Sequence, residues 1–226
     1  MYKYETHLHT APVSKCAKST VRESMEFYKS IGYSGVFITN HFIDGNINFD
    51  KTLPYEDKIN FYFSDYEEGV KLADEIGIQV LGGIETSYRG TDFLIYGLDK
   101  QWYLDHPEIE SLRKSQQLTL FAEHGALIIQ AHPYREASYI DHIRLFPRHV
   151  HGVEVFNSSQ KEFPNDMAEA YAKAYELIPF SGSDCHNVAT KKDFGGMEFE
   201  TPLKDELDFV ERIKNGETNL IKLIIE

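Results

Sequence analysis

The sequence contains little cysteine and no long apolar run. Its two cysteines, Cys16 and Cys185, are too few for a disulfide framework, and they fit a reducing cytoplasm. No apolar run approaches the roughly 20 residues that a membrane-spanning helix needs. The first residues, MYKYETHLHTAP, lack the apolar stretch of a secretory signal. We therefore expect a cytoplasmic protein with no membrane partner.

Positive charge is also scarce. The 226 residues include 23 Lys and Arg against 36 Asp and Glu, which gives a formal net charge of −13 with neutral histidines. Such a surface repels a phosphate backbone, so the charge argues against a nucleic-acid partner. The chain also lacks GxGxxG and GxxxxGKS/T loops, so neither of these nucleotide-binding devices is indicated. The composition leaves the oligomeric state open.

Hydrophobic residues, by contrast, are plentiful and recur in short segments. They make up 42% of the chain, and aromatic residues make up 13%, which is enough for a folded core. Several of the segments are apolar on both faces, as parallel strands buried beneath helices are. The expected strands are 2–6, 35–41, 78–86, 91–98, 127–133, 152–157, 178–186, 197–201 and 219–225.

Helical patterns separate most of these strands. Thr20 and Ser64 are expected helix caps, because each has a glutamate three residues later. The expected helices are 20–32, 64–77, 107–124, 137–146, 165–177 and 204–215. Strand–helix alternation predicts one α/β domain over residues 1–226, and the length favours a closed or nearly closed barrel over an open sheet. The aromatic stretch 42–66 is interpreted as a packed loop, with a lid as the alternative.

Polar side chains gather at the ends of the expected strands. Because the carboxyl ends of parallel strands lie at one face of an α/β fold, these side chains would meet in space although they are remote in sequence. Five of the ten histidines are among them. The residues are His7, His9, His41, Glu85, His132, Glu154, Asn157, Asp184 and His186.

The type and spacing of these residues indicate metal binding. His7 and His9 are two positions apart, so both project from one side of an extended chain and can chelate one cation; Asp184 and His186 share this spacing. Imidazoles and carboxylates without a thiolate cluster suit Zn, Mn or Fe(II). The two oxygens of Glu85 could bridge two cations. Pairs of cations about 3.5–4 Å apart commonly catalyse the hydrolysis of phosphate esters.

Five short motifs carry most of these residues. They are THLHT (6–10), ITNH (38–41), GIET (83–86), QAHPYR (130–135) and GSDCH (182–186), with GVEVFN (152–157) between the last two. In this order the set resembles the PHP superfamily (polymerase and histidinol phosphatase). The resemblance implies a distorted (β/α)7 TIM-like barrel, two or three divalent metal ions at the strand ends, and hydrolysis of phosphoesters.

The resemblance also implies a ligand set with two incomplete positions. It gives the first ion His7, His9, Glu85 and Asp184, the second ion Glu85 and His132, and the third ion His41 and His186. The loop APVSKCAKS lacks the Asp or His of many members, and Cys16 is its only soft ligand; a small packing residue is the alternative role for this cysteine. After the fourth strand, where some members have a His, the sequence GLDK offers only Asp99. Asn40 replaces the usual Asp of T-D-H.

Further residues are candidates for binding a substrate. Arg135 and Arg89 could each clamp a phosphate, and the alternative for each is an ordinary surface arginine. Glu154 and Asn157 are expected substrate contacts, or Glu154 supports the metal ligands. Cys185 points away from its two neighbours and is interpreted as packing. The remaining five histidines, in or beside helices, are interpreted as structural.

Together these residues predict a metal-dependent phosphoric ester hydrolase. A metal-activated hydroxide would attack a small phosphorylated metabolite, a phosphomonoester as in histidinol phosphatases, without a protein nucleophile. The alternatives are a phosphodiesterase or nuclease acting on nucleotides or oligonucleotides, an inactive metal-binding regulatory domain, and an amide or lactone hydrolase. The residues expected to carry catalysis are His7, His9, Glu85, His132, Asp184 and His186.

Overall fold

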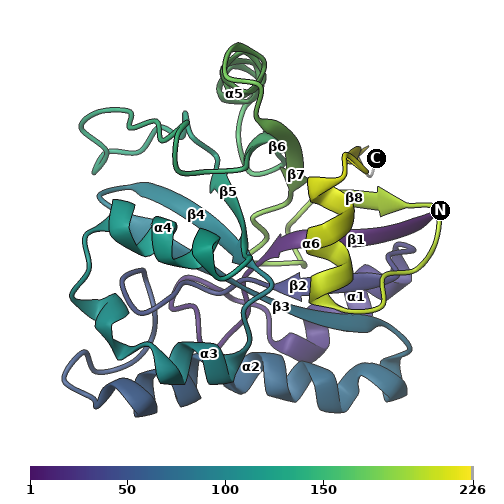
Figure 1. Cartoon of the computed structure of the whole chain (residues 1–226). Coiled ribbons are helices and arrows are strands. Elements are labelled where there is room, and N and C mark those ends of the chain that lie inside the picture. Colours follow the sequence, from purple (N-terminus) through teal and green to yellow (C-terminus); the bar gives the residue numbers. More distant parts are fainter. Residues whose placement is uncertain (225–226) are drawn as a thin grey trace.

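In the computed structural model, which describes residues 1–224, one mixed sheet forms the centre of the fold (Figure 1). Neighbouring strands follow the order β7-β6-β5-β4-β3-β2-β1-β8-β9. The strands are β1 (Tyr2–Leu8), β2 (Gly35–Ile38), β3 (Gln79–Tyr88), β4 (Thr91–Tyr96), β5 (Leu127–Ala131), β6 (Gly152–Asn157), β7 (Ile178–Gly182), β8 (Asp193–Phe199) and β9 (Asn219–Ile224).

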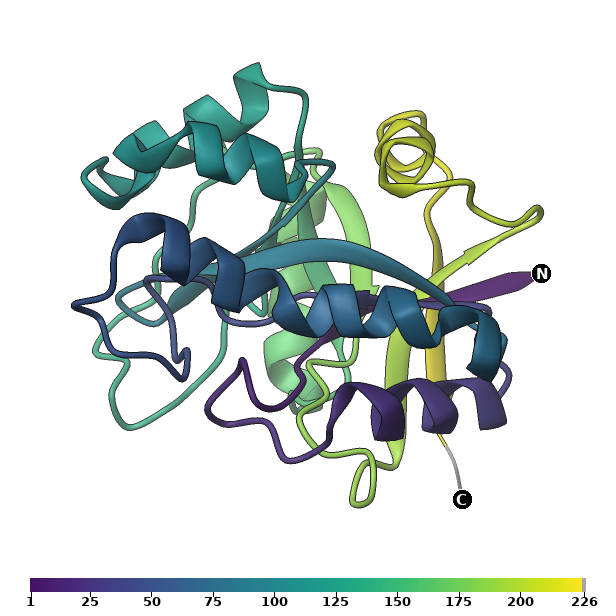
Figure 2. The ribbon, with the colours of Figure 1, turned by 90° about the horizontal axis from the view of Figure 1, so that it is seen from below.

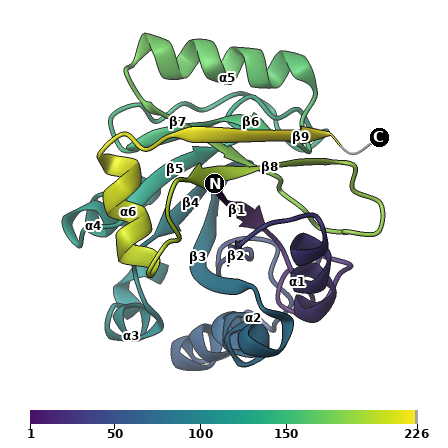
Figure 3. The ribbon, with the colours of Figure 1, turned by 90° about the vertical axis from the view of Figure 1, so that its right-hand side faces the viewer.

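The helices lie around this sheet. They are α1 (Val21–Ser30), α2 (Tyr55–Ile76), α3 (Lys100–Asp105), α4 (Lys114–Glu123), α5 (Glu162–Ala174) and α6 (Glu206–Lys214). Figure 2 shows α1 and α2 side by side, and the two helices are in contact. Figure 3 shows α5 on the outer side of β6 and β7. Within residues 1–224, no helix combines the length and the apolar character that a membrane crossing requires.

The two ends of the sheet approach each other and nearly close a barrel. β7 lies against β1, β8 and β9, as Figure 3 also shows for β9. Serine hydroxyls make contacts here: Ser181 Oγ donates to the Ile221 carbonyl (2.8 Å), and Gly195 N donates to Ser183 Oγ (2.8 Å). A Cβ at Gly195 would lie 2.3 Å from the Gly182 carbonyl oxygen, so only glycine allows this approach. The expected distorted TIM-like barrel is confirmed.

An apolar plug fills the end of the barrel where β1 begins. Tyr4, Phe37 and Phe180 point into it from three strands, and Phe209 and Ile213 of α6 cover it. All of these side chains are nearly inaccessible to solvent. The interior is therefore closed by hydrocarbon at one end, which leaves the carboxyl end of β1 as the site for polar side chains.

Strand direction differs from the expectation at β4. β1, β2 and β3 are parallel, and so are β5, β6 and β7, but β4 is antiparallel to both of its neighbours. The cause is the tight turn at Arg89 and Gly90, where both residues have positive φ and the chain reverses as a hairpin. The start of β4, rather than its end, therefore lies beside the end of β3.

Helix α2 is longer than expected. It begins at Tyr55 instead of Ser64 and ends at Gly77 as predicted, where φ is +74°. The Ser64 hydroxyl does not cap the helix but donates to the Phe61 carbonyl within it (2.7 Å). Tyr62 and Phe63 are buried in the core, and this packing stabilises the earlier turns. Residues 55–66 of the aromatic stretch are thus helical, so the predicted loop is wrong for this half of the stretch, although Tyr62 and Phe63 are packed in the core.

Two other helix predictions are wrong. The expected helix 107–124 consists of a 3₁₀ turn, Pro107–Glu110, and the separate helix α4, with α3 before them. Helix α3 stops at His106 because a residue before proline disfavours the α conformation. The segment 137–146 is a loop: Gln130 Nε2 donates to the Arg144 carbonyl (2.8 Å), and the Phe146 N–H donates to Gln130 Oε1 (3.1 Å). A buried side chain thereby fixes the loop without helical hydrogen bonds.

Candidate metal centre

The end of β1 carries the first two members of the centre. His7 and His9 are fully buried, and their Nε2 atoms lie 3.1 Å apart. The alternation of an extended strand places both imidazoles on one side, as the spacing predicts. The other ring nitrogens are held from behind: Nδ1 of His7 lies 3.0 Å from Glu154 Oε1, and Nδ1 of His9 lies 3.1 Å from Ser14 Oγ.

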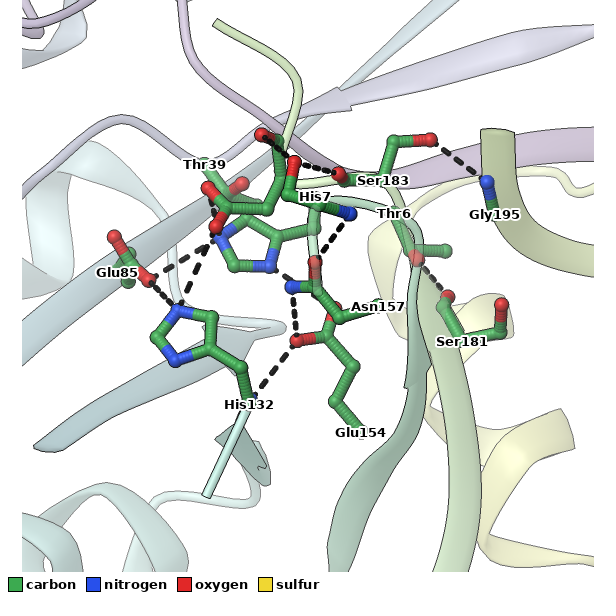
Figure 4. Close-up of polar contacts among 12 residues, drawn as sticks. Thr6, His7, Thr39, Glu85, His132, Glu154, Asn157, Ser181, Ser183 and Gly195 are labelled. Atoms are coloured by element: carbon green, nitrogen blue, oxygen red, sulfur yellow. Dashed lines mark hydrogen bonds and ion pairs between the residues drawn. The ribbon is translucent and has the colours of Figure 1, made fainter. Parts of the chain in front are cut away.

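Glu85 of β3 contacts four imidazoles, and Figure 4 shows it joined by dashed lines to two of them, His7 and His132. Its Oε1 is 3.2 Å from His7 Nε2 and 3.4 Å from His132 Nε2. Its Oε2 is 3.4 Å from His9 Nε2 and 2.6 Å from His41 Nδ1. The two oxygens of one carboxylate therefore face different groups of nitrogens, which is the arrangement that a bridging ligand requires.

Asp184 enters the centre from the end of β7. Its backbone has φ +51°, and that of His132 after β5 has φ +25°, a left-handed region in which Asp and His are among the residues most often found. This conformation turns both side chains inward. Asp184 Oδ1 lies 3.6 Å from His7 Nε2 and 3.4 Å from His9 Nε2, and Oδ2 lies 3.8 Å from His132 Nε2.

Several buried atoms of the centre lack a hydrogen-bond partner within residues 1–224. They are both Glu85 oxygens, His41 Nδ1 and His132 Nε2. Buried polar groups are nearly always satisfied, and these four lie close to atoms of opposite charge without hydrogen-bond geometry. Convergent lone pairs of this kind fit divalent cations, and nitrogen and carboxylate oxygen are suitable donors for Zn, Mn or Fe(II). The residues present therefore fit the metals that the sequence predicts.

The potential ligand atoms form three overlapping groups within which all atoms lie inside 4.8 Å. The groups are His7, His9 and Asp184; His7, Glu85 and His132; and His9, His41 and His186. Each of these groups includes at least two residues of one ligand set that the motifs predict. The structure thus brings together every residue of those sets.

The charges of the centre shift one another's protonation. Burial alone would raise the pKa of Glu85, but the imidazoles of His41, His7 and His9 hold it well below its usual range. Burial would likewise raise the pKa of Asp184, and His7 lowers it well below normal. Burial opposes a charge on His7, yet the carboxylates around it raise its pKa well above normal. In the metal-free centre the carboxylates and most of the imidazoles therefore favour one another's charged forms.

His9 is the exception among the imidazoles. Burial and the neighbouring rings of His186 and His41 lower its pKa well below normal. The three ring centroids are close: 4.2 Å separates His9 from His186, and 4.3 Å separates it from His41. His9 is accordingly neutral, the form that coordinates a metal ion.

Glu154 and Asn157 of β6 support the centre and are fully buried. Glu154 Oε1 contacts His7 Nδ1, and Oε2 accepts hydrogen bonds from the His132 N–H (3.0 Å) and from Asn157 Nδ2 (2.8 Å). Through these bonds Glu154 fixes two ligand-bearing segments at once. Of the two roles that the sequence allowed for it, this geometry corresponds to supporting the ligands.

Asn40 supports the loop that follows β1. Its Oδ1 accepts from the Thr10 N–H (2.7 Å) and from Ser14 Oγ (2.8 Å), and its Nδ2 donates to Asp65 Oδ2 (3.0 Å). An aspartate could not make this last donation. The replacement of the usual Asp by Asn is thus matched by a buried carboxylate from α2, which sequence reasoning did not single out.

Asp99 lies outside the centre. Its carboxylate caps α3 by accepting from the Trp102 N–H (2.8 Å). Asp92, which sequence reasoning missed, is the carboxylate that β4 contributes: its Oδ2 is 3.9 Å from both His132 Nε2 and Arg135 Nη1. The Arg-Gly turn was the signal that could have identified Asp92, because a hairpin places the start of the second strand beside the end of the first.

The centre opens into a polar cavity of about 420 Å³. The lining residues are Arg135, Glu136, Ser159, Gln160, Lys161, Pro164, Asp184 and His186. Arg135 therefore lines the cavity beside the centre, and its role as a phosphate clamp stays a prediction. Arg89 does not line the cavity: it is exposed in the β3–β4 turn, with its guanidinium over the Tyr88 ring at 5.6 Å.

Cys16 lies at the outer side of the centre. Its Sγ is 3.2 Å from His41 Nε2. Burial would raise the pKa of this thiol, but hydrogen bonds with His186 and His41 lower it to about 6. Cys185, by contrast, is fully buried among apolar side chains, and burial raises its pKa to about 11.

Solved structures share this fold, whereas no family model and no curated protein matches the chain. A two-domain protein from Bacteroides vulgatus containing a predicted PHP-like metal-dependent phosphoesterase is similar with a TM-score of 0.69 and 16% identity, over 97% of this chain and 64% of that one. A protein from Bifidobacterium adolescentis described as a candidate metal-dependent phosphoesterase has a TM-score of 0.59 and 13% identity, over 94% and 96% of the two chains.

An amidohydrolase from Chromobacterium violaceum, solved with bound sulfate and no metal, is similar with a TM-score of 0.56 and 12% identity, over 97% of both chains. At these identities the likeness establishes the fold. It confirms the architecture that the five motifs predicted. The chain spans somewhat less than two thirds of the Bacteroides protein, 64% of its length.

Proposed function

We propose that this protein is a metal-dependent phosphoesterase that hydrolyses a small phosphomonoester. The observation that carries the proposal is a buried group of imidazoles and carboxylates with unpartnered atoms, directly beside a cavity that contains Arg135 and Lys161. Cations and a substrate anion would then meet at one place. The names of the solved structures that share the fold, two of which are called metal-dependent phosphoesterases, support the same activity class.

The chain offers ligands for up to three ions. His7, His9 and Asp184 would hold the first with Glu85, which would bridge to a second ion at His132, and His41 and His186 would hold a third. Divalent ions bound there supply a water of lowered pKa and neutralise charge on phosphate oxygens. Zn, Mn and Fe(II) all suit these donors.

Protein groups around the ions would bind and orient the substrate. Arg135 can face two phosphate oxygens with its planar guanidinium, and Asp92 holds that group from the side of the centre. Glu154 keeps His7 in one orientation through Nδ1, so that Nε2 points at the ions. The apolar plug behind the centre excludes bulk water from that side.

The cavity indicates the size and polarity of the substrate. Its volume of about 420 Å³ lies in the range of small-molecule sites, and its lining is mostly polar. The chain's net charge of −13 disfavours a polyanion such as nucleic acid. A small, hydrophilic phosphorylated metabolite therefore fits better than an oligonucleotide.

The test compares hydrolysis of p-nitrophenyl phosphate with that of bis-p-nitrophenyl phosphate, in protein loaded with Mn or Zn. We expect faster turnover of the monoester and a loss of more than about 100-fold in His9→Ala and Asp184→Asn. His142→Ala is the matched control, because this histidine is exposed beside Asp141 and belongs to none of the three groups of potential ligands. Circular dichroism confirms that each variant is folded.

Other outcomes identify the alternatives. Preference for the diester would favour a phosphodiesterase or nuclease, and turnover of cyclic amides or lactones alone would favour attack on carbon. Metal binding without any turnover over a panel of phosphorylated metabolites, histidinol phosphate included, would favour a regulatory domain. Turnover that survives in both ligand variants would contradict the proposed site.

A further inference from the structure

Cys16, in the loop between β1 and α1, lies beside the imidazoles of His41 and His186, which are called the outer imidazoles below. Cys16 Sγ lies 3.2 Å from His41 Nε2, and His186 is near enough to help lower the pKa of the thiol. These three residues come from separate parts of the chain: the loop after β1, the end of β2 and the segment after β7. The cysteine is half-buried at this point rather than enclosed in the core.

The remaining nitrogens of these two histidines are already in use. His41 Nδ1 lies 2.6 Å from Glu85 Oε2, and His186 Nδ1 lies 3.1 Å from the Asp184 carbonyl and 3.4 Å from its Oδ1. A histidine that ligates a metal through one nitrogen usually contacts a carboxylate or carbonyl through the other. Both rings therefore present Nε2 as the atom for an ion on the side of Cys16.

A second observation indicates a cation at this place. The imidazoles of His9, His41 and His186 form one group of potential metal ligands within 4.8 Å, and Cys16 Sγ lies beside the His41 ring of this group. A thiol can donate its single proton to only one of the two rings that it contacts. A metal ion between the sulfur and the Nε2 atoms of His41 and His186 would contact all three donors at once.

We propose that Cys16 is a sulfur ligand of an outer cation position, shared with His41 and His186, and that this sulfur makes the outer position select zinc over manganese. The inference rests on the metal centre of the proposed function and deepens it. The inner positions have only nitrogen and oxygen donors, which can hold either Mn or Zn, whereas a thiolate adds a further preference for the softer ion, zinc. One centre would therefore hold two classes of position.

Cobalt provides the first test, because a Co(II)–thiolate bond absorbs in the near ultraviolet. Full-length protein is stripped with a chelator, desalted and titrated with Co(II). We expect the charge-transfer band in wild type and in Cys185→Ala, which keeps Cys16, and its loss in Cys16→Ser and Cys16→Asp. A band that persists in both Cys16 variants, or cobalt binding by wild type without a band, would overturn the inference.

Metal counting provides the second test. Elemental analysis after loading with zinc should give one ion fewer per chain in Cys16→Ser than in wild type. In competition between Zn and Mn, Cys16→Asp should lose preference for zinc at the outer position by at least about tenfold. Equal zinc content in wild type and Cys16→Ser would contradict the assignment; matched melting temperatures show that the variants remain folded.

The outcomes separate this inference from the proposed function. Hydrolysis of the monoester without a thiolate band would overturn the cysteine ligand alone. A thiolate band that depends on Cys16, in a protein that hydrolyses no phosphoester, would support the ligand and contradict the phosphoesterase.

Discussion

Glu154 illustrates how a single residue sets the geometry of its neighbours. Its two oxygens accept from or contact His7 Nδ1, the His132 N–H and Asn157 Nδ2, and no part of it is exposed. Carboxylates behind ligating histidines fix the ring orientation and make the ring a stronger ligand. The role of Glu154 is therefore to prepare His7 for an ion without touching the ion itself.

Glu154→Gln tests this role. The amide keeps the shape and part of the hydrogen bonding but removes the negative charge that faces His7, so we expect metal affinity to fall by about 10–100-fold. Competition with a chromophoric chelator measures the affinity. Glu123→Gln, on the exposed side of α4, is the control and should bind metal as wild type does. Unchanged affinity in Glu154→Gln would contradict the role.

Residue types and spacing predict much of the centre at this scale. His7 and His9 could be recognised because two imidazoles at alternate positions of a strand must share a side. Asp65 could not, because its contacts with Asn40 and Thr10 depend on how α2 packs over the loop. A sequence shows which groups can bind a metal, but not which distant carboxylate completes their hydrogen bonds.

Among the secondary-structure elements, α3 and β4 show why Asp99 was considered for the metal centre although Asp92 lies beside it. Asp99 begins this short helix by accepting from the Trp102 N–H. Asp92, seven positions earlier in the hairpin, is the residue near His132 and Arg135. The direction of β4 decides between them.

Asp99→Ala should destabilise the protein without affecting metal binding. Loss of a helix cap costs about 1 kcal/mol of unfolding free energy. Urea unfolding measures that cost, and chelator competition should give a metal affinity equal to that of wild type. An affinity that falls with Asp99 would mean that this residue is a ligand after all.

Asp92→Asn is expected to affect substrate binding and to leave the cap of α3 intact. Arg135 loses its charged neighbour, so the KM for a phosphomonoester should rise several-fold, while the cap of α3 is untouched. Steady-state kinetics at saturating metal measure the change. A KM equal to that of wild type would show that Asp92 does not position Arg135.

Elements with clear stop and start signals could be predicted well. Thr20 with Glu23 forms the expected capping box, and Gly77 ends α2 in the left-handed conformation. The start of α2 and the loop 137–146 could not be predicted, because tertiary contacts of Tyr62, Phe63 and Gln130 override local preference there.

At the scale of the whole molecule, the charges of the centre link stability to pH. The pKa values of His7 and His41 are raised by the carboxylates around them, against the effect of burial, while burial and neighbouring imidazoles lower that of His9. Imidazoles of raised pKa stabilise the fold below their unfolded value of 6.5, and this contribution is lost as the pH rises through the folded value. His9 acts in the opposite sense below 6.5.

The metal-free protein should therefore be most stable close to pH 6.5. Above this pH the stabilisation from His7 and His41 declines. Below it the burial of neutral His9 costs stability, and below about 4.5 the contribution of Glu85, whose pKa is lowered, is progressively lost as well. Urea midpoints between pH 4 and 9 measure the profile. A midpoint that rises steadily from pH 6.5 to 9 in the absence of metal would contradict it.

The barrel could be predicted from strand–helix alternation and the order of the motifs, but its closure could not. Ser181 and Ser183 join β7 to the strands across the gap, and Gly195 permits the approach. Nothing in the local pattern of these residues indicates such a partner, since Ser181 meets Ile221 and Ser183 meets Gly195 only when the sheet curls.

The same gap has a consequence for how the chain matures. His7 and Asp184 lie on opposite sides of the gap between β1 and β7. Among residues 1–224 the only strand-like link across this gap is the single bridge between Leu8 and Cys185. A metal ion bound by both His7 and Asp184 would link the two sides of this gap, where few backbone hydrogen bonds connect the strands. A nascent polypeptide would then lack its full set of ligands until Asp184 and His186 had been synthesised, so metal loading would indicate that both sides of the gap have come together.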